Sequence, residues 1–360
     1  MQDNGAEKIL IINPGSTSTK IGWFSDGEMK FVENISHSSE EIQGFNRIVD
    51  QKDFRKEVIL NTINDKGLDI NQLSGVVGRG GLLRSIPSGT YLVNETMLAD
   101  LEQGLQGEHA SNLGGLISYE IAQPLGIPSF IVDPVVVDEM DEVARLSGLP
   151  IIPRRSIFHA LNHKAVARTV AEKNFNMKYE DMNFIVAHLG GGISIAAHRK
   201  GKVVDVNNAL NGDGPFAPER AGGLPVWDFV GVALSGKYTR DELKRMLTGK
   251  GGVVAYLGTN NIKEVQERIE KGDKEAETVL DAMVYQISKE IGALSTVFEG
   301  NVDAIILTGG VAHNNYLVNE VKRRVAFITD VIVFPGEDEM DALAHGALRV
   351  LRGKEEAKKY

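Results

Sequence analysis

The chain has 360 residues, of which 42% are hydrophobic and 24% are charged. This length exceeds the size at which a single hydrophobic core usually stops growing, so we expect two domains. The formal charge of −10 at pH 7 argues against binding to nucleic acid, which needs a basic surface. The sequence contains no cysteine, which excludes disulfides, thiolate metal sites and cysteine catalysis.

The start of the chain and its apolar runs predict neither export nor membrane insertion. Residues 1–7 are polar and lack the layout of a signal peptide. No apolar run approaches the roughly 20 residues that a membrane span needs. We therefore expect a cytoplasmic protein without a membrane partner.

The first predicted element is a β-hairpin. Residues 9–12 are four large apolar residues, which is typical of a buried strand, and residues 21–24 form the partner strand. The loop between them contains Gly15, which lets backbone approach a ligand, then four hydroxyl residues and Lys20. These groups suit the oxygens of a phosphate group. An ordinary polar hairpin loop is the alternative, because the same residue types are common in turns.

The same order of elements occurs a second time. Residues 184–189 form another apolar run, which is followed by three glycines at 190–192, a second apolar run and a turn at Gly201. Aligning Gly27 of the first copy with Gly201 offsets the copies by 174 residues, close to half of the 360. This duplication predicts two similar domains that face one another across a cleft, each with one phosphate-binding hairpin.

Two candidate side chains lie at the ends of later strands. Residues 75–83 are predicted to form a short strand that contains Arg79 between two glycines. These glycines leave room for the Arg79 guanidinium to grip a carboxylate. A solvated turn arginine is the alternative. A strand at 129–132 ends in Asp133, where α/β folds bind ligands, although Asp before Pro is also a common turn starter. The helices predicted around these strands cover residues 54–66, 94–103 and 111–123.

The second half begins with a predicted helix at 159–173. His159 and His163 lie four residues apart on one face, but no acidic third ligand is nearby in sequence, so structural or substrate-facing histidines are favoured over a metal pair. A long loop rich in Gly and Pro, residues 207–225, carries Arg220. We interpret it as an active-site loop rather than a mobile linker.

A third glycine-rich loop follows near the end. A buried strand at 304–307 leads into Gly309, Gly310 and a helix that begins near residue 316, a geometry that suits the phosphates or ribose of a nucleotide. The other predicted elements are helices at 241–247, 262–271, 273–298 and 341–352 and a strand at 331–334. The charged tail after the last helix is expected to fray.

Several common motifs are missing. The sequence has no G-x-x-x-x-G-K-[ST], no G-x-G-x-x-G opening a helix and no G-x-S-x-G. A P-loop NTPase, a dinucleotide dehydrogenase and an esterase are therefore disfavoured. Three phosphate-type loops remain, at residues 13–20, 188–194 and 307–315.

These loops resemble those of the acetate and sugar kinase, Hsp70 and actin superfamily, and within it those of the acetokinase family. Residues 13–20 resemble the first acetokinase phosphate loop, residues 188–194 the second and residues 307–311 the adenosine loop. The resemblance implies an α/β protein with a duplicated ribonuclease-H-like (actin-like ATPase) fold and two domains flanking a nucleotide cleft. The predicted domains are residues 1–155 plus 341–360 and residues 156–340. The implied ATP/ADP-binding residues are Asn13, Gly15, Ser16, Thr17, Ser18, Lys20, His188, Gly190, Gly191, Gly192, Gly309, Gly310 and Asn314.

Within this family the chain is most similar to butyrate kinases. The similar stretches are residues 76–83, 107–113, 130–139, 156–168 and 205–222. Such enzymes convert a short-chain acyl phosphate and ADP to the carboxylic acid and ATP, reversibly and with Mg²⁺. The resemblance thus implies a phosphotransferase whose partner is a short-chain carboxylic acid or acyl phosphate. Because acetokinases are at least dimers, it also implies a homo-oligomer.

The resemblance also implies catalytic roles. Arg220 matches the arginine that stabilises the transferring phosphoryl group, and His159 matches the histidine that hydrogen-bonds it. Asp133 stands where a catalytic aspartate orients the site. Glu339 resembles the glutamate that positions Mg²⁺, and Asn13 is assigned to the same metal site. One departure concerns Arg79, which stands in the place of a family histidine, so its role is inferred from its chemistry.

Other activities stay open. A kinase for isobutyrate, propionate or acetate would share all these motifs, because each buried methylene contributes only about 0.8 kcal/mol to chain-length preference. A sugar kinase and a non-kinase ATPase of the actin or Hsp70 type are further alternatives.

Overall fold

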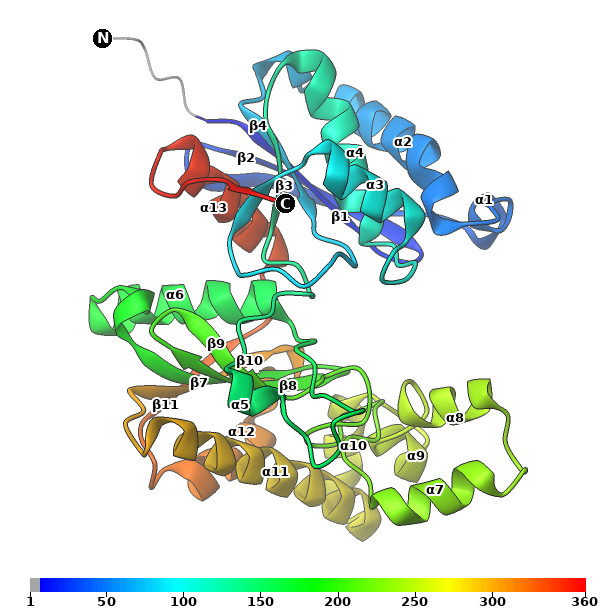
Figure 1. Ribbon diagram of the computed structural model, residues 1–360, viewed down its shortest axis with the longest axis vertical. Helices are drawn as coiled ribbons and strands as arrows, with labels where there is room; N and C mark the ends of the chain where they lie inside the picture. Colours follow the sequence, from blue (N-terminus) through cyan, green and yellow to red (C-terminus); the bar gives the residue numbers. More distant parts are fainter. Residues whose placement is uncertain (1–6) are drawn as a thin grey trace. The chain divides into compact units, whose positions relative to one another are not determined.

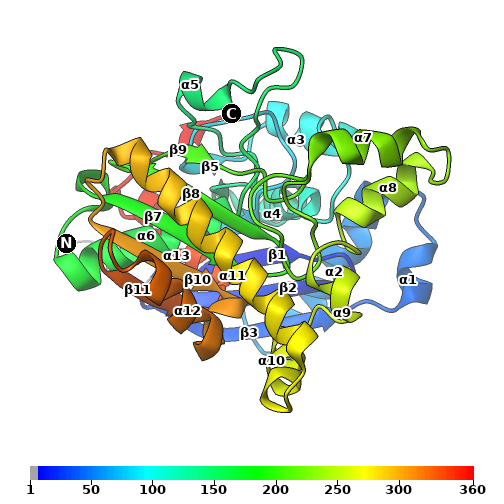
Figure 2. The same cartoon turned by 90° about the horizontal axis from the view of Figure 1, so that it is seen from below.

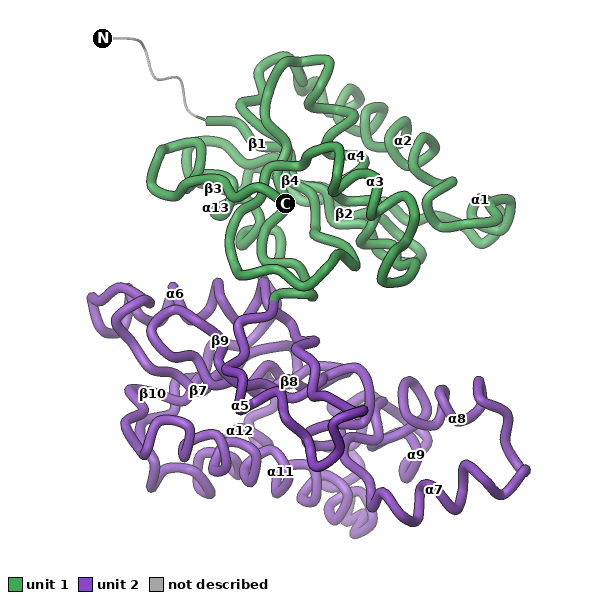
Figure 3. Tube along the Cα trace, viewed as in Figure 1, with its two compact units in different colours: residues 1–137, 338–360 green, residues 138–337 purple. Residues whose placement is uncertain are grey.

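The computed structural model describes residues 7–360, which form two units (Figure 3). Unit 1 runs to residue 137 and resumes with residues 338–360, and unit 2 comprises residues 138–337. The predicted limits of independently folding domains, at 155/156 and 340/341, stay a prediction. The prediction about the polar start of the chain falls largely on residues 1–6, which lie outside the described part.

Unit 1 is built on a seven-stranded mixed sheet with the strand order β12-β5-β6-β4-β1-β2-β3. The strands are β1 Ile9–Pro14, β2 Ser18–Ser25, β3 Glu28–Ser36, β4 Gly75–Arg79, β5 Thr90–Leu92, β6 Ser129–Val132 and β12 Lys358–Lys359. β1, β2 and β3 pair antiparallel in sequence order, whereas β4 runs parallel to β1 and to β6. The predicted hairpin is therefore confirmed, and β1 is fully buried as its apolar run predicts.

Helices cover both faces of this sheet (Figure 1). They are α1 Ser39–Gln43, α2 Lys52–Asp65, α3 Glu95–Gln103, α4 Asn112–Ala122 and α13 Glu339–Leu351. Along β4 a Cβ at Gly78 would point at α4, whereas one at Gly75 would lie 3.6 Å from Leu351 of α13. Because successive strand residues face opposite sides, these two positions place α4 and α13 on opposite faces.

The glycines around Arg79 serve packing. A Cβ on Gly78 would lie 2.0 Å from the carbonyl oxygen of Gly114 in α4, and one on Gly80 would lie 2.5 Å from Cβ of Pro134. The backbone of α4 therefore touches β4, which only paired glycines permit. The interpretation that these glycines leave room beside the Arg79 guanidinium is wrong, because protein atoms already occupy those spaces.

The C-terminal tail is ordered, so the predicted fraying is wrong. β12 pairs with β5 at the edge of the sheet. The hydroxyl of Tyr360 donates to Asp100 over 2.7 Å, and the Tyr360 backbone carbonyl accepts from Asn94 over 3.2 Å. A charged tail is held here by a short edge strand and one anchored aromatic residue, which composition alone does not reveal.

Unit 2 contains a five-stranded sheet with the order β11-β10-β7-β8-β9. Its strands are β7 Asn183–Leu189, β8 Ile193–Arg199, β9 Lys202–Val206, β10 Ala304–Gly309 and β11 Val331–Pro335. β7, β8 and β9 pair antiparallel, as β1, β2 and β3 do in unit 1. Both copies contain a register shift, at Trp23/Phe24 and at Ala197/His198, and these positions differ by the same offset of 174 residues. The predicted duplication of a three-strand unit is confirmed.

Unit 2 has helices on both faces of this sheet. They are α5 Glu142–Arg145, α6 Ala160–Phe175, α7 Val226–Leu234, α8 Arg240–Leu247, α9 Val253–Leu257, α10 Ile262–Glu270, α11 Lys274–Ser295 and α12 Asn315–Val325. α11 runs across the sheet and shares its main core with α12 (Figure 2), while α6 packs with a separate cluster from β7 and β10 on the opposite face. The sequence did not predict α7 or α9. No helix within residues 7–360 combines the length and apolar character that crossing a bilayer requires.

We expect Gly78→Ala to lower the free energy of unfolding of unit 1 by about 2–3 kcal/mol, since the new methyl group would separate α4 from β4. Scanning calorimetry would show this as a lower melting temperature. Gly44→Ala is the matched control, because Gly44 has φ −70° and no atom within 4 Å of the added Cβ. Equal melting temperatures for the two variants would contradict the close approach described above.

Candidate functional site

The first phosphate-type loop connects β1 and β2 of unit 1. Asn13 pairs with Lys20 across the hairpin, and the backbone N–H of Gly15 donates to the carbonyl of Ser18 over 2.7 Å. The side chains of Ser16, Thr17 and Lys20 are exposed. The loop therefore presents two hydroxyls and one ammonium group to solvent, where a phosphate group can be bound.

A buried arginine holds this loop from inside unit 1. Arg55 of α2 is 1% exposed and donates to the carbonyls of Gly15, Ser16 and Ser18 over 2.8, 3.1 and 3.0 Å. It also donates to Thr19 Oγ1 over 3.0 Å. Three carbonyls are thus turned inward, which leaves the loop's exposed hydroxyls directed to solvent.

The charge of Arg55 is not neutralised by a carboxylate within residues 7–360. Its remaining hydrogen bonds go to the amide oxygen of Gln51, at 3.1 and 2.8 Å. Burial lowers the pKa of Arg55 to about 10, so the guanidinium is still charged at neutral pH. The sequence analysis missed this residue. The available signal was its place four and eight residues before the buried Ile59 and Ile63, which put an arginine on the buried stripe of a helix.

Three predicted site residues meet at the ends of β1 and β4. Glu339 opens α13, and its Oε2 accepts from Asn13 Nδ2 at 2.8 Å and from Arg79 Nη1 at 2.9 Å. Arg79 Nη1 also lies 3.4 Å from Asn13 Oδ1. The predicted acid-binding arginine is therefore paired with the predicted metal-site glutamate. Their opposite charges cancel locally, and the positive helix N-terminus adds to the stabilisation of Glu339.

Asp133 lies at the end of β6 in a conformation that non-glycine residues rarely adopt, with φ 38°. The side chain is 2% exposed, and its Oδ1 accepts from Ser88 Oγ at 2.6 Å and from the backbone N–H of Gly89 at 2.7 Å. These two donors fix the direction of the carboxylate.

The second phosphate-type loop connects β7 and β8 in unit 2. Its glycines let an arginine lie directly on the backbone, because a Cβ on Gly192 would be 1.9 Å from Arg220 Nη1. Arg220 also donates to the carbonyl of Ala209, which ties it to the 207–225 loop. Burial lowers the pKa of Arg220 from its usual value, while Glu219 opposes this effect. The predicted catalytic arginine and the predicted glycine loop are therefore in contact.

Two predicted histidines are stacked beside this loop. The rings of His159 and His188 have centroids 3.8 Å apart and an interplanar angle of 12°. His188 is 1% exposed and its Nδ1 lies 2.8 Å from Asn162 Oδ1. Glu337 Oε1 lies 3.0 Å from His188 Nε2, a distance that fits an ion pair, but the two atoms are not aligned for a hydrogen bond, so within residues 7–360 this buried nitrogen has no hydrogen-bond partner.

The histidine pair at 159 and 163 does not form a metal site. Both ring nitrogens of His163 face protein groups, Ser194 Oγ at 2.8 Å and His198 Nε2 at 3.2 Å. Across the described residues, no three or more His, Asp or Glu side chains gather as metal ligands. His163 therefore has protein partners on both ring nitrogens, and the interpretation of these histidines as structural or substrate-facing stays a prediction.

The third glycine-rich loop follows β10. Gly309 has φ 87°, and a Cβ there would lie 2.4 Å from the carbonyl oxygen of Leu189, so only glycine fits. Gly310 is exposed. Asn314 caps α12 by accepting from the Leu317 N–H at 2.9 Å, and its amide donates to Gln266. The Asn314 side chain therefore has structural partners, and its contact with a nucleotide stays a prediction.

Residues 150–335, more than half of the chain, match the model of the acetokinase family. The chain belongs to the acetokinase family. It is accordingly an ATP-dependent kinase that phosphorylates a short-chain carboxylate. The roles assigned to individual residues of this acetokinase stay predictions.

Solved structures of similar fold cover almost the whole acetokinase chain. Acetate kinase from Porphyromonas gingivalis is 20% identical with a TM-score of 0.77, over 95% of this chain and 99% of that one. A propionate kinase from Francisella tularensis subsp. tularensis is 19% identical with a TM-score of 0.73, over 94% and 98%. Acetate kinase from Entamoeba histolytica is 17% identical with a TM-score of 0.76, over 95% and 99%. The predicted duplicated actin-like ATPase fold is confirmed.

We expect Arg55→Lys to weaken ATP binding about tenfold or more. A lysine ammonium is a compact charge that cannot reach the same carbonyls together, and each lost hydrogen bond to a charged group is worth about 1.5–3 kcal/mol. Isothermal titration calorimetry would measure the change. Arg352→Lys, which alters a surface pair with Glu7, is the control. Unchanged ATP affinity in Arg55→Lys would show that the loop keeps its conformation without this arginine.

Gly192→Ala should reproduce the effect of Arg220→Ala, because its methyl group would displace the Arg220 guanidinium. Loss of one preorganised donor commonly lowers kcat by about 10²- to 10³-fold. Steady-state kinetics of both variants would test this, with Gly231→Ala as control, since a Cβ there meets no atom within 4 Å. Near-normal turnover in Arg220→Ala would remove this residue from the catalytic groups.

Proposed function

We propose that this acetokinase is a butyrate kinase, which reversibly converts butyrate and ATP to butyryl phosphate and ADP. The observation that carries the proposal is the segment that contains Arg79. It resembles butyrate kinases, it departs from acetate kinases at the acid-binding positions, and it ends at the charged cluster with Glu339. The half-buried Leu82 that follows suits an alkyl tail next to a bound carboxylate, whereas Leu83 is 1% exposed and belongs to the core of unit 1.

In the proposed reaction, a carboxylate oxygen attacks the γ-phosphorus in line with the leaving ADP oxygen. Arg79 holds the carboxylate as its counter-ion. Arg220 and His159 donate to the equatorial oxygens of the transferring phosphoryl group, where charge has to be stabilised. Asp133, fixed by its two donors, orients the acid side of the site. Positioning and charge neutralisation, rather than covalent chemistry by the protein, lower the barrier.

The nucleotide is assigned to the glycine-rich loops. The 13–20 and 188–194 loops are proposed to hold the β- and γ-phosphates, while Gly309, Gly310 and residues 251–259 lie on the adenosine side. The inward pull of Arg55 on three carbonyls supports the first assignment, because it leaves the outer surface of the loop to donors. The buried Nε2 of His188, which has no hydrogen bond within the described chain, supports the second.

Glu339 and Asn13 are proposed to hold Mg²⁺. A carboxylate and an amide oxygen are hard donors of the kind that Mg²⁺ prefers, and one or two protein ligands suffice where phosphates and waters complete the coordination. The residues therefore fit the ion, although Arg79 must exchange its contact with Glu339 for one with substrate. When bound, the ion would neutralise charge on the β- and γ-phosphates. We also propose that the enzyme is a cytoplasmic homo-oligomer.

The substrate can be identified with a hydroxamate trap for acyl phosphate. The purified protein is incubated with ATP, MgCl₂, hydroxylamine and one straight or branched acid of two to six carbons, and kcat/KM is compared along the series. Two extra methylenes at about 0.8 kcal/mol each predict a preference for butyrate over acetate of roughly tenfold. A maximum at acetate, propionate or isobutyrate would replace butyrate as the substrate, and no signal with any acid would contradict a carboxylate kinase.

A further inference from the structure

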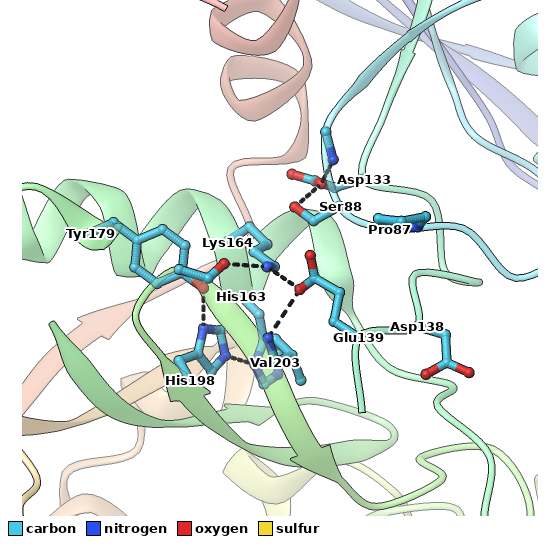
Figure 4. A network of polar contacts seen from close by, with 12 residues as sticks. Pro87, Ser88, Asp133, Asp138, Glu139, His163, Lys164, Tyr179, His198 and Val203 are labelled. Atoms are coloured by element: carbon cyan, nitrogen blue, oxygen red, sulfur yellow. Dashed lines mark hydrogen bonds and ion pairs between the residues drawn. The ribbon is translucent and has the colours of Figure 1, made fainter. Parts of the chain in front are cut away.

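A continuous chain of hydrogen bonds leads from His159 into the interior of unit 2. Helix α6 supplies His163, one turn after His159, and β8 supplies Ser194 and His198, four residues apart on the same strand. The chain continues to Tyr179, in a short 3₁₀ helix that follows α6. Figure 4 shows its inner part, where His163, His198 and Tyr179 lie next to one another. We call Ser194, His163, His198 and Tyr179 the relay.

Every link of the relay has the length of a hydrogen bond. His159 Nδ1 lies 2.8 Å from Ser194 Oγ, which lies 2.8 Å from His163 Nε2. His163 Nδ1 lies 3.2 Å from His198 Nε2, and His198 Nδ1 lies 2.7 Å from the Tyr179 hydroxyl. Ser194, His163 and His198 are each 0% exposed, and Tyr179 is 2% exposed. Water therefore does not compete for these links.

The two inner imidazoles are neutral, which gives the relay a direction. Burial holds the pKa of both His163 and His198 well below the usual value, and neighbouring groups, including Lys164, lower it further. A neutral imidazole has one N–H donor and one acceptor nitrogen, and both nitrogens of each ring are used here. Consequently each ring accepts on one side and donates on the other, so the links on either side of His163 and of His198 must point the same way.

The chemistry of the inner end favours donation outward, toward His159. A phenol O–H is a stronger acid than a neutral imidazole N–H, so Tyr179 is the better donor to His198 Nδ1. Two cations lie near its ring and favour donation, with Lys164 Nζ 5.6 Å and Arg168 Cζ 5.7 Å from the centroid. Lys164 is fully buried and held by Glu139 Oε2 at 2.6 Å and the Gly201 carbonyl at 2.8 Å (Figure 4).

The middle of the relay points the same way. A His198 that accepts from Tyr179 at Nδ1 donates from Nε2 to His163 Nδ1, so His163 carries its own proton on Nε2, which faces Ser194 Oγ. The Ser194 hydroxyl then accepts from His163 Nε2, and its one O–H is available to His159 Nδ1, which lies 2.8 Å away.

We propose that the relay holds neutral His159 in the tautomer that carries its proton on Nε2. The hydrogen bond on one imidazole nitrogen decides which form the other takes, so a donor at Nδ1 makes Nε2 the donor. The significance of this tautomer rests on the proposed function, in which His159 donates to the phosphoryl group. Ser194, His163, His198 and Tyr179 are thus positioning residues that act through His159.

The tautomer can be measured without any activity. Protein labelled with ¹⁵N-histidine gives long-range ¹H–¹⁵N spectra in which protonated and unprotonated ring nitrogens have distinct shifts, and a His159→Gln variant assigns the His159 signals. In the wild-type protein we expect the proton on Nε2 and none on Nδ1. A proton on Nδ1 of neutral His159 would overturn the proposal, whether or not any acid is phosphorylated.

Two variants test whether the relay is the cause. Ser194→Ala removes the donor to His159, and Tyr179→Phe removes one oxygen at the far end while keeping the ring beside Lys164. Both should shift His159 toward a mixture of tautomers and lower kcat about two- to tenfold, with the KM for nucleotide nearly unchanged. Unchanged His159 signals in both variants would overturn the proposal, and a change in Ser194→Ala alone would remove Tyr179 as the source of direction.

Tyr91→Phe is the matched control. Tyr91 is also 2% exposed, and its hydroxyl donates to the Pro87 carbonyl over 2.7 Å in unit 1, outside the relay. The Tyr91→Phe variant should lose about as much stability as Tyr179→Phe, without any change in the His159 signals or in kcat. If the hydroxamate assay detects no acyl phosphate but the His159 tautomer responds as expected, the proposed function fails while the relay stands.

Discussion

The burial of one positive charge beneath a loop of neutral groups is the constraint on which unit 1 depends. Arg55 satisfies its donors with carbonyls of Gly15, Ser16 and Ser18 instead of a carboxylate. Turning these carbonyls inward satisfies a cation that would be costly to bury unpaired. The same contact determines what the loop can present outward, namely hydroxyls and an ammonium group. The same hydrogen bonds therefore satisfy the buried Arg55 and leave the outer surface of the loop able to bind an anion.

In the second copy of the three-strand unit, the cation beside the phosphate-type loop is held in a different way. Its loop has glycines instead of hydroxyls, and the cation, Arg220, lies on the glycine backbone rather than beneath a ring of carbonyls. The space next to the loop is filled by the stacked rings of His159 and His188, and His159 lies within hydrogen-bond distance of Ser194 in the relay. Duplication thus preserved the strand pairing and the position of the register shift, while the side chains at the loops diverged.

Local patterns in the sequence were sufficient to predict most of the strands and helices and the three glycine-rich loops. Apolar runs bounded by glycine predicted β1, β7 and β10, and the 174-residue offset predicted the duplicated unit that both sheets contain. The candidate site residues were also found locally, because glycine-rich loops after buried strands are short motifs. Arg55 was missed, since one arginine on a helix gives no sign of which loop it will meet. The glycines beside Arg79 were misinterpreted, because their purpose lies in Gly114 of another element.

The sequence by itself determined the fold class, the repeat and the family, since all three follow from residues close together in the chain. Only the tertiary structure decided which groups meet. Asn13 and Glu339 are 326 residues apart, and the β12 strand pairs with β5 although the tail looks unstructured. The relay joins α6, β8 and a separate turn through one serine, two histidines and one tyrosine, which share no motif in the sequence. Such contacts depend on strand order and helix packing, which bring together residues that share no local pattern.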